Sequence, residues 1–251
     1  MVSAENAATI TLGGDATHLL GSALGPNRVY GSIFASNWSG YVAATSGDDP
    51  QQAISGAKGS FSVPLLSKAT PGMVAIWIGV GGILKRDKQL IQAGVDVNSA
   101  SGTIEYYAWY ELYPDPQTKI PVTIHGGDKV TVTVQSVAGL NQWKIALNNL
   151  ITGENYTTTV TYKASMLSAE WIVEAPVLCT WSCNQAGLPD FEKIQFEKSQ
   201  VAIGGQELAI SKVWYDGVVI VKIDTGKVKA LTENSSLTED GTSFSVKKTH
   251  G

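Results

Sequence analysis

The run SAEWIVEAP, residues 168–176, places two carboxylates on a pattern that is typical of a β-strand. Side chains along a strand point alternately to its two faces. Glu170 and Glu174 therefore share one predicted face with Ile172. Acids do not suit a packed apolar core, because burying an unpaired charge is costly. We interpret this face as part of a concave polar surface.

A second run, LIQAGVDV at residues 90–97, carries an amide and a carboxylate on one alternation. Gln92 and Asp96 fall on one predicted face, and apolar side chains such as Ile91 and Val95 fall on the other. The apolar face suits the core of a sheet protein, so we expect the face with Gln92 and Asp96 to be wetter.

A third run, EYYAWYELYP at residues 105–114, alternates acids with large aromatic rings. One predicted face holds Glu105, Tyr107, Trp109, Glu111 and Tyr113. Such a face is costly to bury and unusual to leave fully exposed. A ligand cleft uses both kinds of group, because rings supply contact area and acids supply polar anchors. The run therefore favours a binding cleft.

Each of these residues also has an ordinary structural explanation. Most polar faces of antiparallel sheets are simply solvated, so Gln92 or Glu111 alone would be a surface residue. Trp77 in AIWIGVG and Trp38 in SNWSG would each, taken alone, be a packing tryptophan. No single one of them establishes a site.

Other catalytic chemistries find little support in the sequence. The three histidines are His18, His125 and His250. A Ser-His-Asp triad would depend on His125, and no G-x-S-x-G motif accompanies it. The glycines of GVGG at 79–82 lack the Lys-Ser/Thr that follows in a phosphate-binding loop. The sequence contains no cluster of metal-ligating residues, and we expect neither a metal nor a cofactor.

The elements that must position these residues are strands. From Asn37 onward, more than ten short strand patterns follow one another, separated by turns such as Gly-Gly, Thr-Gly and Asp-Gly. This pattern, with almost no helix, indicates an antiparallel β-sandwich or barrel. Residues 1–35 lack sustained periodicity, and we interpret them as an N-terminal arm or residual pro-segment. Residues 36–251 are expected to form a single domain.

The composition of the chain indicates the environment in which the protein works and the partners it can bind. Charged residues make up 16% of the 251 residues, against about 25% in typical soluble domains. Few ionisable groups mean little self-repulsion in acid, which suits an acid-facing protein; a secreted β-protein rich in Thr, Ser and Gly is the alternative. The net charge of −4 offers no basic patch, so nucleic acid is not an expected partner. The sequence shows no membrane span, and a monomer is the default expectation.

Export is consistent with several features. The two cysteines, Cys179 and Cys183 in LCTWSCN, have no histidine nearby and make a poor zinc site, so we predict a local disulfide, with free thiols as the alternative. Sequons begin at Asn37, Asn155 and Asn234. The first twenty residues contain no secretory h-region, so an exported protein would have lost its signal peptide.

The ordered blocks SNWSGY, AIWIGVGG, LIQAGVD, YYAWYELYP, PVTIHGGDKVTVTV, NLITGENYTTT and SAEWIVEAP resemble the glutamic peptidases, or eqolisins, over residues 36–248. Any one block is weak, but the set in this order is specific. The resemblance implies a secreted, acid-acting endopeptidase. It also implies an all-β fold, an antiparallel β-sandwich of two large sheets of the jelly-roll, concanavalin-like kind.

By this resemblance, Gln92 and Glu170 match the catalytic glutamine and glutamate of the family. The positions that match its substrate cleft are Trp38, Trp77, Asp96, Trp109, Glu111 and Tyr113. Tyr107 is a departure, because fungal members usually have an acid there. That difference affects the hydrogen bonds around the catalytic pair and the pH range of activity.

The implied chemistry is coherent. Glu170 would take a proton from an attacking water and return it to the leaving amine. The amide of Gln92 would donate to the oxyanion of the tetrahedral intermediate. Work in acid requires Glu170 to stay ionised, and therefore requires hydrogen bonds that favour its charged form.

Two other classes of protein remain as alternatives. A catalytically inactive or lectin-like sandwich would bind carbohydrate on the face with Trp109, Glu111 and Tyr113. A glycoside hydrolase would pair Glu111 with Glu170 across a sugar, with the two carboxylates roughly 5–10 Å apart. The peptidase instead requires Gln92 beside Glu170, with protein or peptide as the substrate.

Overall fold

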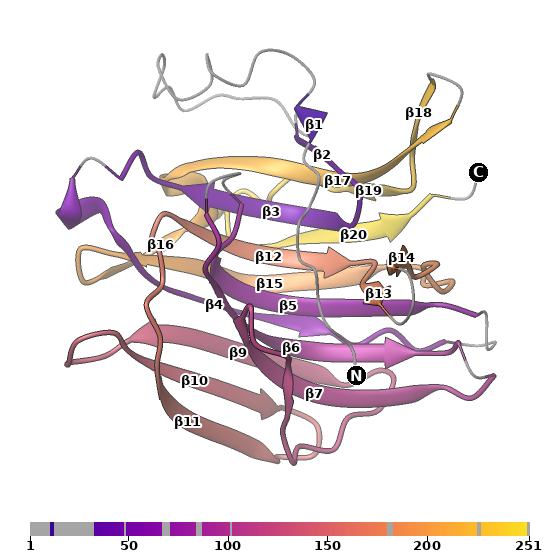
Figure 1. The fold of residues 1–251 in the computed structure, drawn as a ribbon, viewed down its shortest axis with the longest axis horizontal. Helices are drawn as coiled ribbons and strands as arrows, with labels where there is room; N and C mark the ends of the chain where they lie inside the picture. The colour runs from indigo at the N-terminus through magenta and orange to yellow at the C-terminus, as the bar shows by residue number, and fades with distance from the viewer. Residues whose placement is uncertain are drawn as a thin grey trace.

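The computed structural model is a sandwich of two large β-sheets, as Figure 1 shows. It describes residues 11–12, 33–47, 49–66, 71–83, 87–100, 102–179, 183–224 and 227–249. Within these ranges the only helical elements are short 3₁₀ turns at Pro50–Gln52 and Ile210–Lys212. The expected all-β sandwich of two large sheets is confirmed.

The first sheet, sheet A, carries the residues that the sequence singles out. Its strands, in spatial order, are β1 (Thr11–Leu12), β2 (Ile33–Ala35), β17 (Trp214–Asp224), β3 (Trp38–Ala44), β12 (Ser168–Glu174), β5 (Met73–Gly81), β6 (Leu90–Asn98), β7 (Glu105–Tyr113) and β8 (Thr118–Lys119), with β18 (Lys227–Ala230) paired to β17. Neighbouring strands are antiparallel except β2 and β17, which are parallel.

The second sheet, sheet B, closes the other side of the core. Its strands, in spatial order, are β11 (Asn155–Thr161), β10 (Gln142–Asn149), β9 (Lys129–Ser136), β4 (Ile54–Ser62), β15 (Ile194–Ile203), β20 (Phe244–Lys248) and β19 (Thr232–Asn234), with β16 (Gln206–Ala209) paired to β15. A separate small hairpin consists of β13 (Val177–Cys179) and β14 (Cys183–Gln185).

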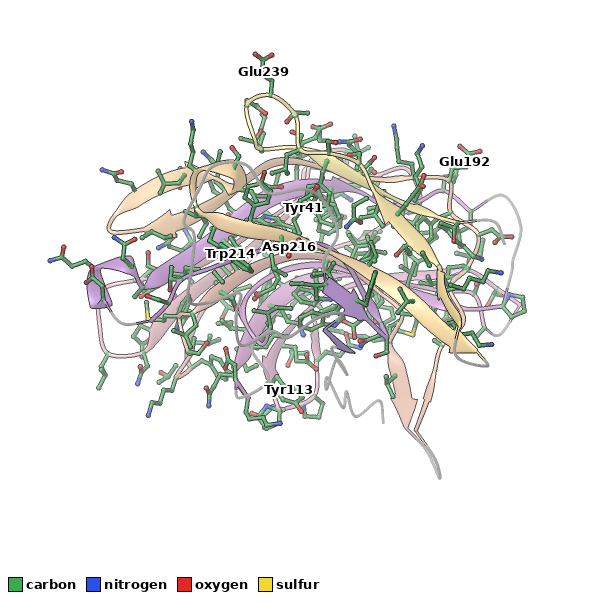
Figure 2. All side chains as sticks on the ribbon, turned by 90° about the horizontal axis from the view of Figure 1, so that it is seen from above. Tyr41, Tyr113, Glu192, Trp214, Asp216 and Glu239 are labelled. Atoms are coloured by element: carbon green, nitrogen blue, oxygen red, sulfur yellow. The ribbon has the colours of Figure 1, made fainter. Side chains whose placement is uncertain are left out.

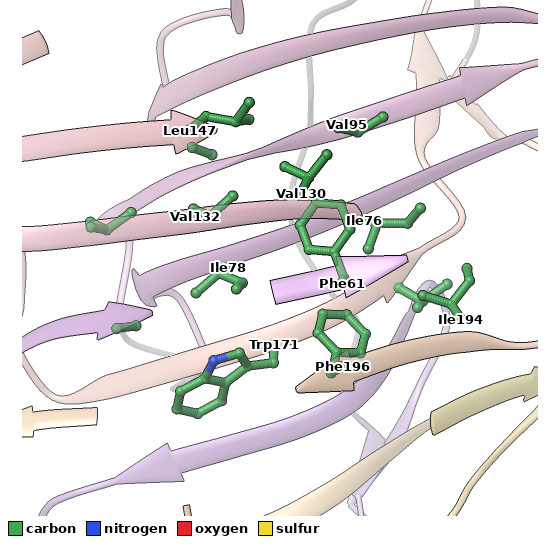
Figure 3. Packing of buried hydrophobic residues seen from close by; sticks show 14 of the residues in the cluster. Phe61, Ile76, Ile78, Val95, Val130, Val132, Leu147, Trp171, Ile194 and Phe196 are labelled. Carbon is green, nitrogen blue, oxygen red and sulfur yellow. The ribbon is translucent and has the colours of Figure 1, made fainter. Parts of the chain in front are cut away.

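The main core lies between the two sheets. Figure 3 shows Ile76, Ile78 and Trp171 from sheet A packed with Phe61 and Phe196 from sheet B. The rings of Phe61 and Phe196 lie 5.9 Å apart between centroids. Large apolar side chains fill this layer because both sheets direct one alternation of each strand toward it.

A second apolar cluster lies on the opposite face of sheet A. It includes Trp38, Trp77, Trp109 and Ile172, all buried. For this reason every residue of β5 and β12 is buried, on both alternations, whereas edge strand β11 exposes every second residue. The outer face of sheet A is therefore packed with buried side chains, as its inner face is.

The two outer sides of the sandwich differ in character. Tyr113, at the end of β7, and Glu239, in the loop between β19 and β20, project from opposite sides of the molecule (Figure 2). Tyr113 packs against the aromatic cluster of sheet A. Glu239 is exposed.

Three further sequence expectations, on the N-terminal arm, the cysteines and a membrane span, can be compared with the described residues. Ile33–Ala35, the end of the expected arm, form β2 within sheet A, and the division between residues 35 and 36 stays a prediction. Cys179 and Cys183 face each other in the register of β13 and β14, but their side chains lie outside the described part of the structure. Within the described ranges, no helix has the length and apolarity to cross a bilayer.

Candidate active site

The register of sheet A brings Glu170 and Gln92 into one cross-strand row. Glu170 on β12 lies opposite Gly79 on β5, and Gly79 lies opposite Gln92 on β6. Gln92 in turn lies opposite Glu111 on β7. Directly opposite residues point to the same face of a sheet. All three polar side chains of this row therefore lie on the outer face of sheet A.

A parallel row of polar groups runs two pleats along. Glu174 lies opposite Ala75, which lies opposite Asp96, which lies opposite Tyr107. Trp38 on β3 pairs with Glu174 from the other side. This row lies on the same face as the first, because the two rows are four residues apart along each strand, an even number.

Aromatic rings fill the space between the two polar rows. Ile172 lies opposite Trp77, and Trp77 and Trp109 flank Gly94. A Cβ atom at Gly94 would lie 2.2 Å from the backbone oxygen of Ile76 and 2.7 Å from the Cβ of Trp77, so the close packing requires glycine. The structure thus places all eight predicted site residues on one face. Tyr113 lies at the end of β7, two residues beyond Glu111.

Glu170 is the most isolated polar group of the site. It is fully buried, and neither carboxylate oxygen has a hydrogen-bond partner among the described residues. Burial raises the pKa of Glu170 well above its ordinary value, and the charge of Asp87 raises it further. The nearby hydroxyl of Ser168 and the backbone N–H of Gly81 act in the opposite direction.

Gln92 is fixed by a neighbouring carboxylate. Its Nε2 donates a hydrogen bond to Oε2 of Glu111, and its Oε1 has no partner among the described residues. Both side chains are buried. An amide nitrogen carries two hydrogens, so one N–H of Gln92 is used by Glu111 and a second remains for another acceptor.

The gap between Glu170 and Gln92 exists because residue 79 is glycine. A Cβ atom at Gly79 would lie 2.9 Å from the Cβ of Gln92 and 2.9 Å from the backbone oxygen of Ile91. Two strand spacings separate Glu170 from Gln92, about 9–10 Å between Cα atoms. Two long polar side chains can approach a small molecule or a peptide bond across that gap.

Glu174 is held by two donors. Trp77 donates from Nε1 at 2.8 Å, and Asn37 donates from Nδ2 at 3.0 Å. Burial raises the pKa of Glu174 to about 8, and the charges of Glu111 and Asp96 add to the effect. Trp38 packs edge to face on Trp77, with the ring centroids 4.9 Å apart. Glu174 therefore anchors Trp77 and, through it, Trp38, two rings that we call the aromatic floor of this face.

Asp96 is the second buried acid of this row that is held by hydrogen bonds. It accepts hydrogen bonds from Trp109 Nε1 and from Tyr107 Oη, both at 2.7 Å, and from Gln117 Nε2 at 3.3 Å. Burial raises the pKa of Asp96 to about 6, although its hydrogen bonds oppose the rise. Lys119 places its Nζ 3.8 Å from the centroid of the Tyr107 ring. Tyr107, where the resemblance leads one to expect an acid, thus acts as a donor to Asp96.

Two openings accompany this face. One is a narrow pocket of about 30 Å³ whose lining includes Gln92, Asp96, Glu111 and Glu174. The other, of about 490 Å³, lies beside Tyr113 and is bordered by Lys88, Lys163 and Tyr162. No group of three or more His, Cys, Asp or Glu ligands converges in the described part of the chain.

The geometry does not favour a pair of glycosidase carboxylates. Glu170 and Glu111 are separated by Gly79 and Gln92, which is three strand spacings or about 14 Å between Cα atoms. Glu111 is engaged by Gln92. The group that lies next to Glu170 across the glycine is an amide, as a peptidase of the predicted kind requires.

Three residues of the site are not among those that the sequence predicts. Asn37 supports Glu174, Gln117 supports Asp96, and Ser168 lies on the strand of Glu170. Asn37 stood out only as a sequon, and Ser168 only as part of a motif. Gln117 lies between β7 and β8 with no pattern to mark it.

Comparison with known proteins identifies the family. Residues 36–247 match the model of the Peptidase A4 family. Aspergillopepsin-2 of Aspergillus niger is 25% identical over 219 residues, which cover 75% of this chain and 74% of that protein.

Solved structures show the same fold. A scytalido-glutamic peptidase crystallised with a transition state analog inhibitor has a TM-score of 0.68 at 22% identity, covering 85% of this chain and 98% of its own. The aspergilloglutamic peptidase from Aspergillus niger has a TM-score of 0.57 at 28% identity, covering 70% of this chain and 99% of its own. The chain therefore belongs to the Peptidase A4 family and is a glutamic endopeptidase.

Proposed function

We propose that this protein is an acid-acting endopeptidase in which Glu170 activates a water molecule and Gln92 stabilises the oxyanion. The observation that carries the proposal is the placement of these two side chains on either side of Gly79, in one row of sheet A. Both retain atoms without a hydrogen-bond partner among the described residues. Buried polar groups are nearly always paired, so unpaired ones mark a place where substrate or water binds.

Glu170 acts as general base and then as general acid. Its carboxylate accepts a proton from the water as the water attacks the scissile carbonyl carbon, which becomes tetrahedral. The same proton then passes to the leaving nitrogen as the carbon–nitrogen bond breaks. Because its two oxygens have no other partner among the described residues, both the water and the leaving amine can bind there.

Gln92 donates to the negative oxygen that forms in the first step. Glu111 holds one N–H of the amide, which directs the other toward the space above Gly79. An oxyanion donor of this kind is commonly worth about 3–4 kcal/mol of transition-state stabilisation. An amide keeps its hydrogens in acid, so this donor does not depend on pH.

The ionisation of Glu170 is the demanding part of the mechanism. Burial raises its pKa, yet a base must be charged to accept a proton. Hydrogen bonds donated to the carboxylate favour the charged form and offset the cost of burial. The donors that lie close enough are Ser168 and the N–H of Gly81, together with the attacking water.

The substrate is an extended stretch of protein or peptide. It lies along the outer face of sheet A, above the buried rings of Trp38, Trp77 and Trp109, which support the polar side chains of the two rows. Secretion and a disulfide between Cys179 and Cys183 belong to the same proposal, and the register that places the two cysteines opposite each other supports the disulfide.

Residues 1–35 act in this proposal as an inhibitory pro-segment. β1 is the edge strand of sheet A and lies four strand spacings from β12, which is about 19 Å. Clipping near Ser36 as the pH falls would release the active site.

The test is cleavage of a denatured protein between pH 2 and 7, in the presence of pepstatin and a chelator. Glu170→Gln, which removes the base at nearly constant shape, is expected to abolish cleavage. Glu239→Gln is the control, because Glu239 is exposed on the opposite side of the sandwich (Figure 2). Full activity of Glu170→Gln, or no cleavage by the parent chain at any pH after removal of the arm, would contradict the proposal.

A further inference from the structure

Ser168 is a fully buried serine on the strand that carries Glu170. Its Oγ has no hydrogen-bond partner among the described residues. Ser168 and Glu170 are two residues apart on β12, so both side chains point to the outer face of sheet A. A buried hydroxyl without a partner is rare in folded proteins and needs an explanation.

The surroundings of Glu170 explain what such a hydroxyl could do. The ionisable groups that face Glu170 are all acids: Glu174 on its own strand, Asp216 on β17, Glu111 on β7 and Asp87 before β6. The strands directly beside Glu170 contribute Val42 and Gly79, which carry no charge. Lys88, next to Asp87, and Lys222, on β17, are the described cations on these elements, and neither is among the groups that shift the pKa of Glu170. Neutral donors must therefore favour its charged form.

Ser168 is such a donor. A serine hydroxyl can rotate about its Cβ–Oγ bond and place its hydrogen where an acceptor appears. It lies close enough to Glu170 to lower the pKa of that carboxyl, although the two form no hydrogen bond in the structure. The other donor, the N–H of Gly81, belongs to the backbone and is present with every residue except proline.

We propose that Ser168 is a positioning residue that donates its hydroxyl hydrogen to the carboxylate of Glu170 and keeps that carboxylate ionised in acid. The inference rests on the proposed role of Glu170 as the general base. Ser168 does not touch the substrate. It sets the lower pH limit at which Glu170 accepts a proton.

The consequence appears in the pH profile. The acid limb of kcat/KM reports the ionisation of the base in the free enzyme. Loss of a hydrogen bond to the charged form makes the base easier to protonate, so the limb moves to higher pH. A hydrogen bond to a charged group corresponds to a shift of roughly one pH unit, which is about a tenfold loss of kcat/KM at a pH below the limb.

The experiment compares Ser168→Ala and Ser168→Cys with the parent full-length chain, on one soluble peptide substrate. Ser168→Cys keeps the size of the side chain but replaces a good donor by a weak one. Ser199→Ala is the matched control, because Ser199 is also fully buried with an unpartnered Oγ but lies on β15 in sheet B. The acid limb is expected to move up by about one unit in Ser168→Ala and by less in Ser168→Cys. It should not move in Ser199→Ala.

An acid limb of Ser168→Ala within about 0.2 units of the parent would overturn the inference. If Ser168→Ala does not fold, Ser168→Cys decides the question, and a limb equal to that of the parent would again overturn it. An equal shift in Ser199→Ala would show a general packing effect and would also overturn it. The result for Glu170→Gln stands apart: if that variant is inactive and the limb of Ser168→Ala is unmoved, the base is retained and only the role of Ser168 is lost.

Discussion

Glu170 and Gln92 face each other across a single glycine, Gly79, in one row of sheet A. Each comes from a different strand, and the two positions are 78 residues apart in the sequence. The hydrogen-bonded register of β12, β5 and β6 therefore sets their separation, and rigid sheet elements hold catalytic groups more accurately than loops do.

Closing the gap at Gly79 should remove activity. The Cβ of Gly79→Ala would lie 2.9 Å from the Cβ of Gln92 and 3.2 Å from Cδ1 of Leu90, so the amide must move. We expect kcat/KM to fall by roughly 100-fold, because a displacement near 1 Å has effects of that size. Overpacking should also lower the free energy of unfolding by about 1–3 kcal/mol.

The control for that variant is Gly187→Ala. The nearest atom to a Cβ at Gly187 is the backbone oxygen of Pro71 at 3.7 Å, an ordinary contact. Peptide hydrolysis and urea unfolding should both stay at the parent values in the control. Unchanged kcat/KM in Gly79→Ala would show that the space above Gly79 is not where the scissile bond binds.

Glu111 should affect catalysis through Gln92. Its carboxylate accepts a hydrogen bond from Nε2 of Gln92 and so fixes the direction of the amide. Glu111→Leu removes that acceptor, and we expect kcat to fall by about 10- to 100-fold with a smaller change in KM, as for a misplaced oxyanion donor. Glu111→Gln retains an oxygen acceptor of similar shape and should recover most of the loss. Steady-state kinetics on both variants decide the matter, and equal kcat values for Glu111→Leu and the parent would rule out this role.

Much of this site follows from alternation alone. The faces assigned to Gln92, Glu170 and Glu111 from their own strands are the faces on which the structure places them. The partners across strands could not be predicted in the same way, because a single strand contains no information on its register with a distant strand. The glycine between Glu170 and Gln92 and the support of Glu174 by Asn37 depend on that register.

The fold should be more stable in mild acid than at neutral pH. Burial raises the pKa of Asp96 to about 6 and that of Glu174 to about 8. In the unfolded chain both carboxyls titrate near 4, so the folded state binds the proton more tightly. The contribution of these two carboxyls to the free energy of unfolding is therefore fully present below about pH 4. It is lost as the pH rises toward the folded pKa of each group. Each contributes a slope of up to about 1.4 kcal/mol per pH unit.

Urea unfolding at intervals from pH 4 to pH 8 measures this slope. Glu174→Gln should flatten it up to about pH 8, whereas Asp96→Asn should flatten it only below about pH 6. Glu239→Gln, at an exposed position, should follow the parent curve. A parent whose free energy of unfolding rises between pH 5 and 8 would contradict the assignment of both groups.

Of the three sequons, only Asn155 is suited to carry a glycan in the folded protein. N-glycosylation attaches the sugar to the side-chain nitrogen. In Asn37, which is 1% exposed, that nitrogen donates a hydrogen bond to Glu174 at 3.0 Å. In Asn234, it donates to the backbone oxygens of Gly40 and Val218. A glycan at either position would break these contacts, and at Asn37 it would disturb the anchor of the aromatic floor.

Asn155 has none of these constraints. It is exposed at the start of β11, the edge strand of sheet B, and its Nδ2 makes only a 3.5 Å contact with the backbone oxygen of Gly153. Secretion from a eukaryotic host should therefore give active protein with a glycan at Asn155 alone. Peptide mass spectrometry after glycosidase treatment locates the glycan, and Thr157→Ala, which destroys this sequon, should yield unmodified and fully active enzyme. A glycan found on Asn37 or Asn234 in active protein would contradict the contacts described for those side chains. A bulky sugar at Asn155 would also cover the edge of β11, which pairs with no other strand among the described residues.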